Sequence, residues 1–422
     1  MKGRIHYGFV IVAAVFIDLL VCGGIFFGAS GIFIVPVSTA LGIGQGQFSL
    51  YLTIQSLTIA VGVMLAPRLL AKYSFRTLNA ISSVVAGMGF VLMGFAQNAL
   101  LLYVGGVMIG LGCVFLTYLI AGTLLPHWFS QNLGTAIAVA MAGLGLGGII
   151  FNPVISALVN GNGLLGFAEG WRSAYVILGG FVTLVCLPLA IFVIRDNPSD
   201  RGVLPYGAGN VTEEKGVRVS EGVEKSVAVK SASFVWYCIM VLCFTLPGAI
   251  MSYLPALASQ SAAGSRISGI IGSVGMFGAI LGGFVIGAAN DRFGAHIGGL
   301  VAGACGIAGF ILMMIGRDNP VLLLAGGALY GIFYQINQVQ MPAMVRMLYG
   351  DLDYDRIFPL GATISPWVGA VSFSLWGFLF DATGSYNVML LAGITCGILT
   401  AVTGILAVIS GRKLPRKRVE VR

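Results

Sequence analysis

The sequence has little charge: only 9% of its 422 residues are Asp, Glu, Lys or Arg, whereas 58% are hydrophobic. Soluble globular domains carry about 25% charged residues, so this composition excludes an ordinary soluble protein. A net charge of +8 would suggest a nucleic-acid partner in such a protein. In a membrane protein, however, basic residues gather in loops and set the orientation. We therefore expect the lipid bilayer, and no nucleic acid, as a partner.

Sequence patterns for enzyme chemistry are also missing. We find no metal-ligand spacing, no nucleophile motif and no phosphate-binding glycine loop, so we expect no enzyme activity, no cofactor and no metal. The seven cysteines lie in apolar segments without paired spacing, which favours buried apolar side chains over metal binding or disulfides. A membrane sensor is disfavoured because the sequence contains no sizeable soluble domain.

Long apolar segments are what the sequence does contain. A helix needs about 20 apolar residues to cross a bilayer, and the chain supplies twelve such segments. We place them at 7–36, 47–70, 77–96, 99–125, 133–159, 171–194, 233–258, 267–288, 297–316, 321–345, 359–380 and 386–410. The predicted fold class is therefore an all-α integral membrane protein with two six-helix bundles, 1–194 and 233–422.

Residues 195–232 form the one long polar run and hold 12 of the 38 charged residues. If this connector and both termini are cytoplasmic, 20 of the 23 Lys and Arg residues lie on the cytoplasmic side, as the positive-inside rule requires. We therefore predict twelve spans in the plasma (cell inner) membrane with both termini cytoplasmic. The connector's glycines and mixed charges predict a flexible link, and its first residues, 195–198, are expected to cap the sixth span.

Two loops in the two halves resemble each other, about 220 positions apart. Residues 71–76 read AKYSFR and residues 291–296 read DRFGAH. Both resemble the short Asp-Arg-x-Gly loop motif of the major facilitator superfamily, although Ala71 stands where the first loop would have its acid. The resemblance implies two halves that rock about a central site. It assigns a conformational role to Asp291, Arg292 and Gly294.

Glycine is abundant, with 62 residues, or about twice the usual share. Several glycines lie four positions apart within predicted spans, which lets helix backbones approach closely in lipid. The pairs are Gly106 with Gly110, Gly143 with Gly147, Gly278 with Gly282, and Gly283 with Gly287. We predict that they pack helices together; a role in sliding between bundles is the alternative.

A closer resemblance begins at Trp128. The stretch 128–153 reads WFSQNLGTAIAVAMAGLGLGGIIFNP, which is similar to the signature of the monocarboxylate transporter family and its bacterial oxalate–formate antiporter relatives. Gln131 and Asn132 stand where that family usually has basic residues. Tyr7-Gly8-Phe9 resembles the aromatic-Gly-aromatic motif before its first span. The resemblance implies proton-coupled symport of a small monocarboxylate such as lactate or pyruvate, and we expect one chain to suffice as a monomer.

The family's site positions can be carried over to this sequence. Tyr118 and the pair Tyr330 and Tyr334 correspond to pore-lining aromatics, whose hydroxyl groups form hydrogen bonds; a packing role is the alternative. Three positions depart from the family. Gly28 stands where the family has a cationic or aromatic residue, Gly283 where it has an Arg, and Ser365 where its antiporter relatives have a Lys. No Lys or Arg lies in the middle of a predicted span, so hydroxyl groups or backbone donors would have to hold a carboxylate.

Asp18 lies about eleven residues into the first predicted span. At about 1.5 Å per residue this is roughly half the hydrocarbon thickness. A charged side chain there costs about 2.5–3.5 kcal/mol on insertion scales and is a functional hypothesis by default. Burial without a nearby cation favours the neutral carboxyl group. We therefore assign Asp18 to proton coupling; a structural Asp bonded to a neighbouring helix is the alternative.

Polar residues next to prolines complete the predicted substrate site. Asn152 precedes Pro153, Ser365 precedes Pro366, and Asn337 belongs to an amide-rich part of the tenth span. Breaks at such places free carbonyl groups that can line a path. Because the chain lacks an ATP-binding segment, we expect a secondary active transporter with alternating access. The alternative substrate is a neutral or cationic amphipathic organic solute, which would need no buried Lys or Arg.

Overall fold

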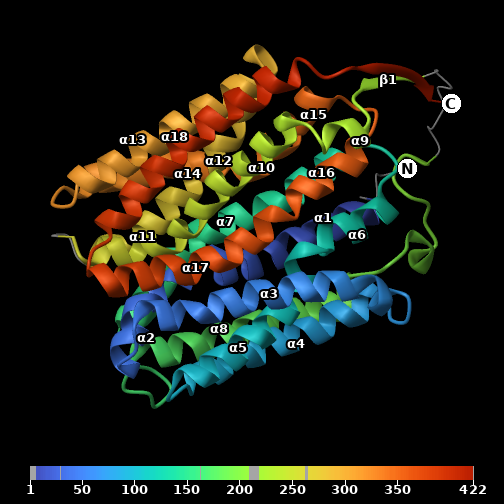
Figure 1. The fold of residues 1–422 in the computed structure, drawn as a ribbon. Helices are drawn as coiled ribbons and strands as arrows, with labels where there is room; N and C mark the ends of the chain where they lie inside the picture. The colour runs from blue at the N-terminus through green and yellow to red at the C-terminus, as the bar shows by residue number, and fades with distance from the viewer. Residues whose placement is uncertain (1–5, 29, 162, 209–217, 262–264, 422) are drawn as a thin grey trace. The chain divides into compact units, whose positions relative to one another are not determined.

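The computed structural model describes residues 6–28, 30–161, 163–208, 218–261 and 265–421. The chain divides into two compact units, Met1–Glu213 and Glu214–Arg422. In the described residues, twelve helical segments are long and apolar enough to cross a membrane (Figure 1). The twelve predicted spans are therefore confirmed, and the chain is a multi-pass membrane protein.

Unit 1 contains six spans, two of which are interrupted in the middle. The first span, Tyr7–Leu41, passes from an α-helix through a π-helix and a 3-10 turn into a second α-helix. The fourth, Ala99–Trp128, also contains a π-helix. The elements are α1 (Tyr7–Asp18), η1 (Leu19–Gly28), η2 (Ser30–Phe33), α2 (Ile34–Leu41), α3 (Gln45–Leu70), α4 (Phe75–Gly94), α5 (Ala99–Cys113), η3 (Val114–Tyr118), α6 (Ile120–Trp128), α7 (Leu133–Asn160), α8 (Gly170–Pro188), η4 (Leu189–Val193) and η5 (Pro198–Arg201).

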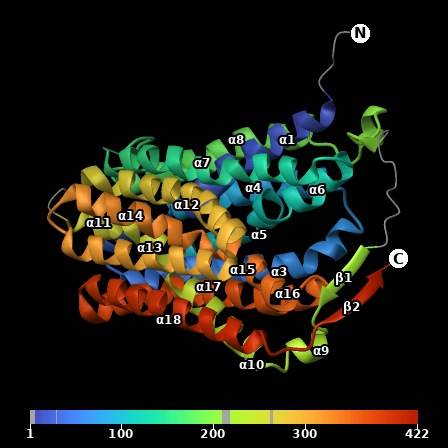
Figure 2. The same cartoon turned by 90° about the horizontal axis from the view of Figure 1, so that it is seen from above.

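Unit 2 contains the other six spans and a small sheet. The spans are built from α10 (Ala232–Thr245), η7 (Leu246–Ala249), α11 (Ile250–Ser259), α12 (Ser265–Phe293), α13 (Ala295–Ile315), α14 (Pro320–Tyr334), α15 (Ile336–Tyr349), α16 (Tyr354–Ala362), α17 (Ile364–Thr383) and α18 (Asn387–Gly411), preceded by the short α9 (Lys225–Ala228). The strands β1 (Arg218–Gly222) and β2 (Lys417–Val421) pair antiparallel (Figure 2). Sequence patterns did not reveal this sheet.

The spans pair in the same way in both units. In unit 1, α4 packs against α5 and α8, and α3 packs against α5. In unit 2, α13 packs against α14 and α18, and α12 packs against α14 (Figure 1). These are the second, third, fourth and sixth spans of each unit. The two units are thus built on the same plan, as the resemblance between the two loops suggested.

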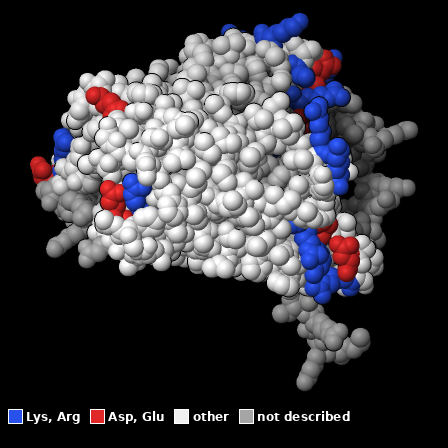
Figure 3. All heavy atoms as spheres, turned by 90° about the horizontal axis from the view of Figure 1, so that it is seen from below, with Lys and Arg blue, Asp and Glu red and all other residues white. Residues whose placement is uncertain are grey.

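Large apolar side chains lie on the surface of both units. Met64, Leu184 and Phe284 are 74–77% exposed. In a soluble protein such exposed apolar surface would be a liability, but it suits contact with lipid. On the face shown in Figure 3, charged side chains gather toward the two ends and the broad surface between them carries almost none.

Three of the four predicted glycine pairs make close helix contacts. A Cβ atom at Gly106 or Gly110 would lie 2.8 or 2.7 Å from a backbone oxygen of α3. A Cβ atom at Gly147 would overlap the Leu20 carbonyl oxygen, and one at Gly143 would overlap the carbonyl of Phe16. Gly278 and Gly282 pack α12 against α14 in the same way. The exception is the pair Gly283 and Gly287, where a Cβ atom would meet no crowded contact.

The connector is docked on both units over most of its described length. Tyr206 exchanges backbone hydrogen bonds with Trp128 and with residues 130–131, and its ring packs against Phe9 and Phe129. This places the two motifs of the monocarboxylate transporter resemblance in one aromatic cluster. At the other end, β1 pairs with β2, and Val223 N donates to Tyr349 O at 2.7 Å. The part of the predicted flexible link between these two contacts, residues 209–217, lies outside the described residues.

Candidate functional site

The interior of unit 1 holds a polar cluster around Asp18. This residue ends α1, and within the described part of the chain it is the one fully buried side chain among the Asp, Glu, Lys, Arg and His residues. Its Oδ2 accepts a hydrogen bond from Asn79 Nδ2 of α4 at 3.3 Å, and the same amide donates to Phe115 O of η3 at 3.2 Å. One amide thus links the first, third and fourth spans.

Two oxygen atoms of this Asp18 cluster have no hydrogen-bond partner in the described structure: Asp18 Oδ1 and Asn79 Oδ1. The ion pairs found among the described residues do not include Asp18 either. A buried polar atom without a partner costs about 1–3 kcal/mol, and an unpaired carboxylate costs more. A protonated carboxyl group therefore fits this environment better than a carboxylate.

The backbone around Asp18 is irregular and tightly packed. The π-helix η1 begins at the next residue, Leu19, and contacts the π-helix η3 of the fourth span. π-Helical segments are rare in proteins, and those that occur are often found at functional sites. On another side, Gly143 and Gly147 let α7 approach α1 and η1 closely. Cys186 of α8 lies beside the Asp18 carboxyl group. Its thiol is 3.4 Å from the thiol of Cys22.

Unit 2 contains a second polar cluster, formed by Thr245, Asn337 and Ser365. Asn337 Nδ2 donates to Ser365 Oγ at 3.0 Å, Ser365 Oγ donates to Asn337 Oδ1 at 3.1 Å, and Thr245 Oγ1 donates to Ser365 Oγ at 3.4 Å. All three residues lie where a span is interrupted: at the end of α10 and at the starts of α15 and α17. Asn337 and Ser365 are only half-buried. Two of the predicted substrate residues are therefore neighbours.

Tyr330 has a different environment from the one expected of a pore-lining residue. It is fully buried, and its hydroxyl group donates to Pro247 O at 2.8 Å and lies 3.1 Å from Gly248 O. These carbonyls belong to η7, where Pro247 interrupts the seventh span, since proline cannot donate a helix hydrogen bond. Trp376 Nε1 donates to Leu246 O in the same turn at 3.0 Å. The contacts of Tyr330 fit the packing alternative.

The other two predicted tyrosines are more exposed than Tyr330. Tyr118 ends η3 and is 56% exposed, and its ring packs edge-on against Phe27 with centroids 6.1 Å apart. Gly28, which follows Phe27, ends η1. Tyr334 ends α14 and is half-buried. A pore-lining role for Tyr118 and Tyr334 stays a prediction.

Asn152 and Gly283 lie on the long helices α7 and α12. Asn152 is fully buried, and its Nδ2 donates to Gly148 O at 2.6 Å, while its Oδ1 has no partner among the described residues. A Cβ atom at Gly283 would come within 3.8 Å of Gln335 Nε2, so an amide stands beside the position where the family has an Arg. Their substrate contacts stay predictions.

The second loop motif sits at the turn between α12 and α13. Asp291 and Arg292 are exposed at the end of α12, and the Arg292 guanidinium lies 5.2 Å from the centroid of the Phe293 ring. Gly294 has a φ of +87° and precedes α13, a backbone conformation that strains any residue with a Cβ atom. The glycine of the motif is thus explained by the turn, and the conformational role of the charged pair stays a prediction.

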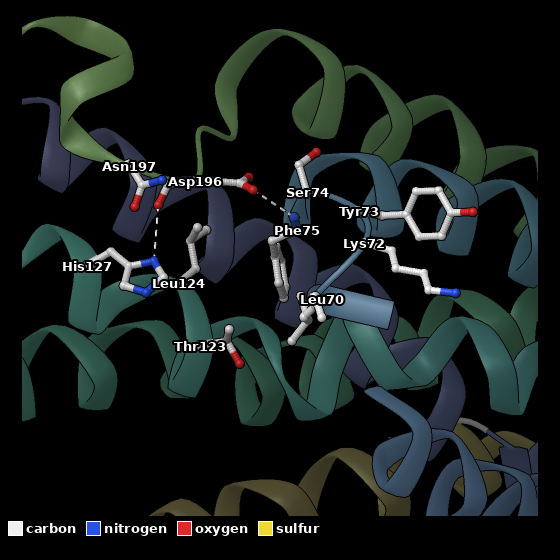
Figure 4. Close-up of a pocket in the computed structure, with 11 residues that line it drawn as sticks. Leu70, Lys72, Tyr73, Ser74, Phe75, Thr123, Leu124, His127, Asp196 and Asn197 are labelled. Atoms are coloured by element: carbon white, nitrogen blue, oxygen red, sulfur yellow. Dashed lines mark hydrogen bonds between the residues drawn. The ribbon is translucent and has the colours of Figure 1, made fainter. Parts of the chain in front are cut away.

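In the first loop, a carboxylate reaches the start of α4 from the connector. Asp196 accepts hydrogen bonds from the backbone N–H groups of Phe75 and Arg76 at 2.7 and 3.0 Å, and His127 Nδ1 donates to Asp196 O at 3.2 Å (Figure 4). Of residues 195–198, which were expected to cap the sixth span, Arg195 donates to the carbonyls of Ile191 and Ile194 at the end of that span, whereas the Asp196 carboxylate bonds to α4 instead. Asp196 therefore supplies a carboxylate to a loop that has Ala71 where the motif has its own acidic residue.

A cavity of about 370 Å³ lies beside Asp196. It is lined by side chains from the end of α3, the start of α4 and the end of α6 (Figure 4). None of the predicted substrate residues lines it. We therefore assign it to the docking of the connector and not to the solute.

Removing the Asp196 carboxylate should destabilise unit 1. Because a carboxylate at a helix N-terminus satisfies free N–H groups and interacts favourably with the helix dipole, we expect Asp196→Ala to cost about 1 kcal/mol. Asp196→Asn, which keeps an acceptor but no charge, should cost less. Thermal unfolding of the detergent-purified variants measures both effects. The exposed Asp318→Ala is the control, and equal melting temperatures for all of them would contradict the capping role.

The twelve spans are built twice on one plan, and each unit holds a polar cluster within its spans; this architecture is that of a membrane transporter of small solutes. The sequence model of the Major Facilitator Superfamily matches residues 19–265, more than half of the chain. Two solved structures share the fold over 97% of this chain and 96% of their own: a D-xylose-proton symporter (TM-score 0.67, 11% identity) and a bacterial homolog of the human lysosomal transporter Spinster (TM-score 0.65, 16% identity). The chain belongs to the Major Facilitator Superfamily.

Among curated proteins, monocarboxylate transporter 12 of Mus musculus is 34% identical over 124 residues, which cover 29% of this chain and 24% of that protein. This chain therefore matches about a quarter of the length of that relative. The 4-hydroxybenzoate transporter PcaK of Acinetobacter baylyi is 25% identical over 289 residues, 60% of each chain. The protein is thus a superfamily transporter that resembles the monocarboxylate transporters, as its motifs at 7–9 and 128–153 suggested.

Proposed function

We propose that this protein is a secondary active transporter that moves a small monocarboxylate together with a proton by alternating access. In this proposal it lies in the plasma membrane, has both termini in the cytoplasm and works as a monomer. The names of two relatives support the substrate class, because one is a monocarboxylate transporter and the other transports 4-hydroxybenzoate, which carries one carboxylate. A D-xylose-proton symporter shares this fold, which supports proton symport as the proposed mode of transport.

The Asp18 cluster is the observation that carries the proposal. A fully buried carboxyl group with one free oxygen and no ion pair among the described residues is suited to take up and release a proton. A protonated Asp18 leaves the bundle interior neutral. Among the described residues no Lys or Arg is buried, so a solute that travels as an acid together with its proton needs no buried base to balance it.

Thr245, Asn337 and Ser365 supply the groups that we assign to the solute in unit 2. Their hydroxyl and amide groups lie at span interruptions well inside the membrane-spanning segments. Hydroxyl and amide hydrogens can donate to a carboxylate, and the interrupted helices add backbone donors. The current hydrogen bonds of Ser365, all between side chains, can be exchanged for bonds to a solute without disturbing the helix backbone.

Substituting Ser365 by alanine should weaken binding of the solute. A hydrogen bond to a charged group contributes about 1.5–3 kcal/mol, so we expect the KM for the monocarboxylate to rise about ten-fold with a smaller change in kcat. Initial rates of labelled-solute uptake into proteoliposomes measure both. Ser372→Ala is the control on the same helix, because the Ser372 hydroxyl bonds to Gly369 O of its own helix. An unchanged KM in Ser365→Ala would remove this residue from the site.

The absence of a buried Lys or Arg from the described residues also favours a second candidate, a transporter or exporter of a neutral or cationic amphipathic solute. The two candidates differ in what competes for transport. Short monocarboxylates should inhibit uptake of the labelled substrate if the first is right. Inhibition by lipophilic amines, with no effect of any monocarboxylate, would establish the second.

A further inference from the structure

Unit 2 has a cavity of about 700 Å³ between the short helix α9 and the start of α16. Three cationic side chains, those of Lys225, Lys230 and Arg356, line it together with the acids Glu224 and Asp353. No predicted substrate residue lines this cavity. Its function is therefore separate from that of the transport site.

Both acids of the cavity already have partners. Glu224 forms an ion pair with Lys417 of β2 at 2.7 Å. Asp353 accepts a hydrogen bond from the backbone N–H of Lys225 at 2.8 Å and lies 3.6 Å from the Arg356 guanidinium. By contrast, the ammonium groups of Lys225 and Lys230 are exposed and form no ion pair or hydrogen bond within the described part of the chain. The cavity therefore presents uncompensated positive charge.

The cavity lies beside the ends of two membrane spans. Lys230 is two residues before the span Ala232–Ser259, and Arg356 is in the first turn of the span Tyr354–Thr383. At about 1.5 Å per residue, the backbone of both residues lies within roughly 3 Å of the end of an apolar span. Val229 and Leu352 line the same cavity and offer apolar contact beside the charges. A bulk solute anion would need no such apolar wall at the membrane surface.

We propose that this cavity binds the phosphate-bearing headgroup of an anionic phospholipid from the adjacent leaflet. Lys225 and Lys230 supply point charges, and the Arg356 guanidinium, only 3.6 Å from Asp353 on one side, supplies further planar donors that suit phosphate oxygens. The bound headgroup would connect α9, which precedes the seventh span, with α16, which begins the eleventh. Binding therefore stabilises unit 2, whichever solute the protein transports.

Thermal unfolding of the full-length protein in a non-ionic detergent tests this proposal. Phosphatidylglycerol should raise the melting temperature, whereas phosphatidylcholine should not. In the Lys225→Gln/Lys230→Gln variant we expect the apparent affinity for phosphatidylglycerol to fall about ten-fold or more, since each basic residue near a membrane surface contributes about 1 kcal/mol. The Arg412→Gln/Lys413→Gln variant removes two exposed charges elsewhere in unit 2 and should keep the wild-type affinity.

Additional measurements with soluble phosphates distinguish a lipid headgroup from a soluble phosphate ligand. Glycerol 1-phosphate and inorganic phosphate at the same concentration should leave the melting temperature unchanged. Stabilisation by either one equal to that by phosphatidylglycerol would indicate a soluble phosphate ligand and overturn the lipid proposal. An equal loss of affinity in both double variants would mean that phosphatidylglycerol binding depends only on the net charge of the protein. That result would also overturn the proposal. Native mass spectrometry should find fewer bound phosphatidylglycerol molecules on Lys225→Gln/Lys230→Gln than on wild type.

Discussion

Replacing Asp18 by asparagine is expected to abolish accumulation of the monocarboxylate driven by a proton gradient, while exchange of the solute between the two sides of the membrane continues. Asparagine has the shape of a protonated aspartic acid and can keep the contact with Asn79, but it cannot release a proton. The measurement compares two assays on the same proteoliposomes: uptake driven by an inward proton gradient, and counterflow of labelled against unlabelled solute. The exposed Asp318→Asn should behave like wild type in both.

These two assays separate a coupling role from a structural one. If Asp18 only holds the first and third spans together, Asp18→Asn should leave both activities intact or reduce both in proportion to the folded fraction. A variant that still shows substrate-dependent proton movement at the wild-type rate would remove Asp18 from the coupling mechanism. Asn79→Ala supplies a second comparison, because it removes the donor to Asp18 and leaves the carboxyl group in place.

The second large effect is expected at Gly147. A Cβ atom there would overlap the Leu20 carbonyl oxygen, so Gly147→Ala must push α7 away from η1 and from the Asp18 cluster. Overpacking of this kind costs about 1–3 kcal/mol. For a chain of this size we expect the melting temperature of the purified protein to fall by about 5 °C, and the transport rate to fall with it.

Gly134→Ala is the matched control for this prediction. Gly134 lies on the same helix, α7, and a Cβ atom there would have no neighbour within 4 Å. Since alanine is a better helix former than glycine by up to about 1 kcal/mol, Gly134→Ala should melt at or slightly above the wild-type temperature. Equal melting temperatures for the two variants would show that the close contact between α7 and η1 does not matter.

The twelve spans could be predicted from sequence because lipid leaves the backbone few choices. A spanning segment must satisfy its own N–H and C=O groups, so a long apolar run is almost always helical. The glycine pairs at 143 and 147 and at 106 and 110 were informative for a related reason: in lipid, close backbone contact is a main source of helix association. Asp18 was visible as the one acid deep in a span.

What the sequence left hidden depends on contacts between distant residues. Asn79 lies near the start of a predicted span, where a polar residue is ordinary, and only the fold brings it to Asp18 from 61 positions away. Asp196 caps a helix that begins 121 positions earlier. Tyr330 was predicted to line a pore, and only the fold shows that its hydroxyl group bonds to the Pro247 carbonyl oxygen, where the seventh span is interrupted. The Pro247-Gly248 pair was the local signal for that interruption.

Proton movement by the reconstituted protein tests the central claim most directly. Proteoliposomes holding a pH-sensitive dye receive lactate or 4-hydroxybenzoate outside, and protein-free vesicles and Asp18→Asn proteoliposomes give the background from passive entry of the acid. The proposed symport predicts internal acidification that is faster with the wild-type protein than in either control and that saturates with solute concentration. Acidification no faster than in protein-free vesicles for every short monocarboxylate, together with uptake of a neutral or cationic solute, would contradict the proposal.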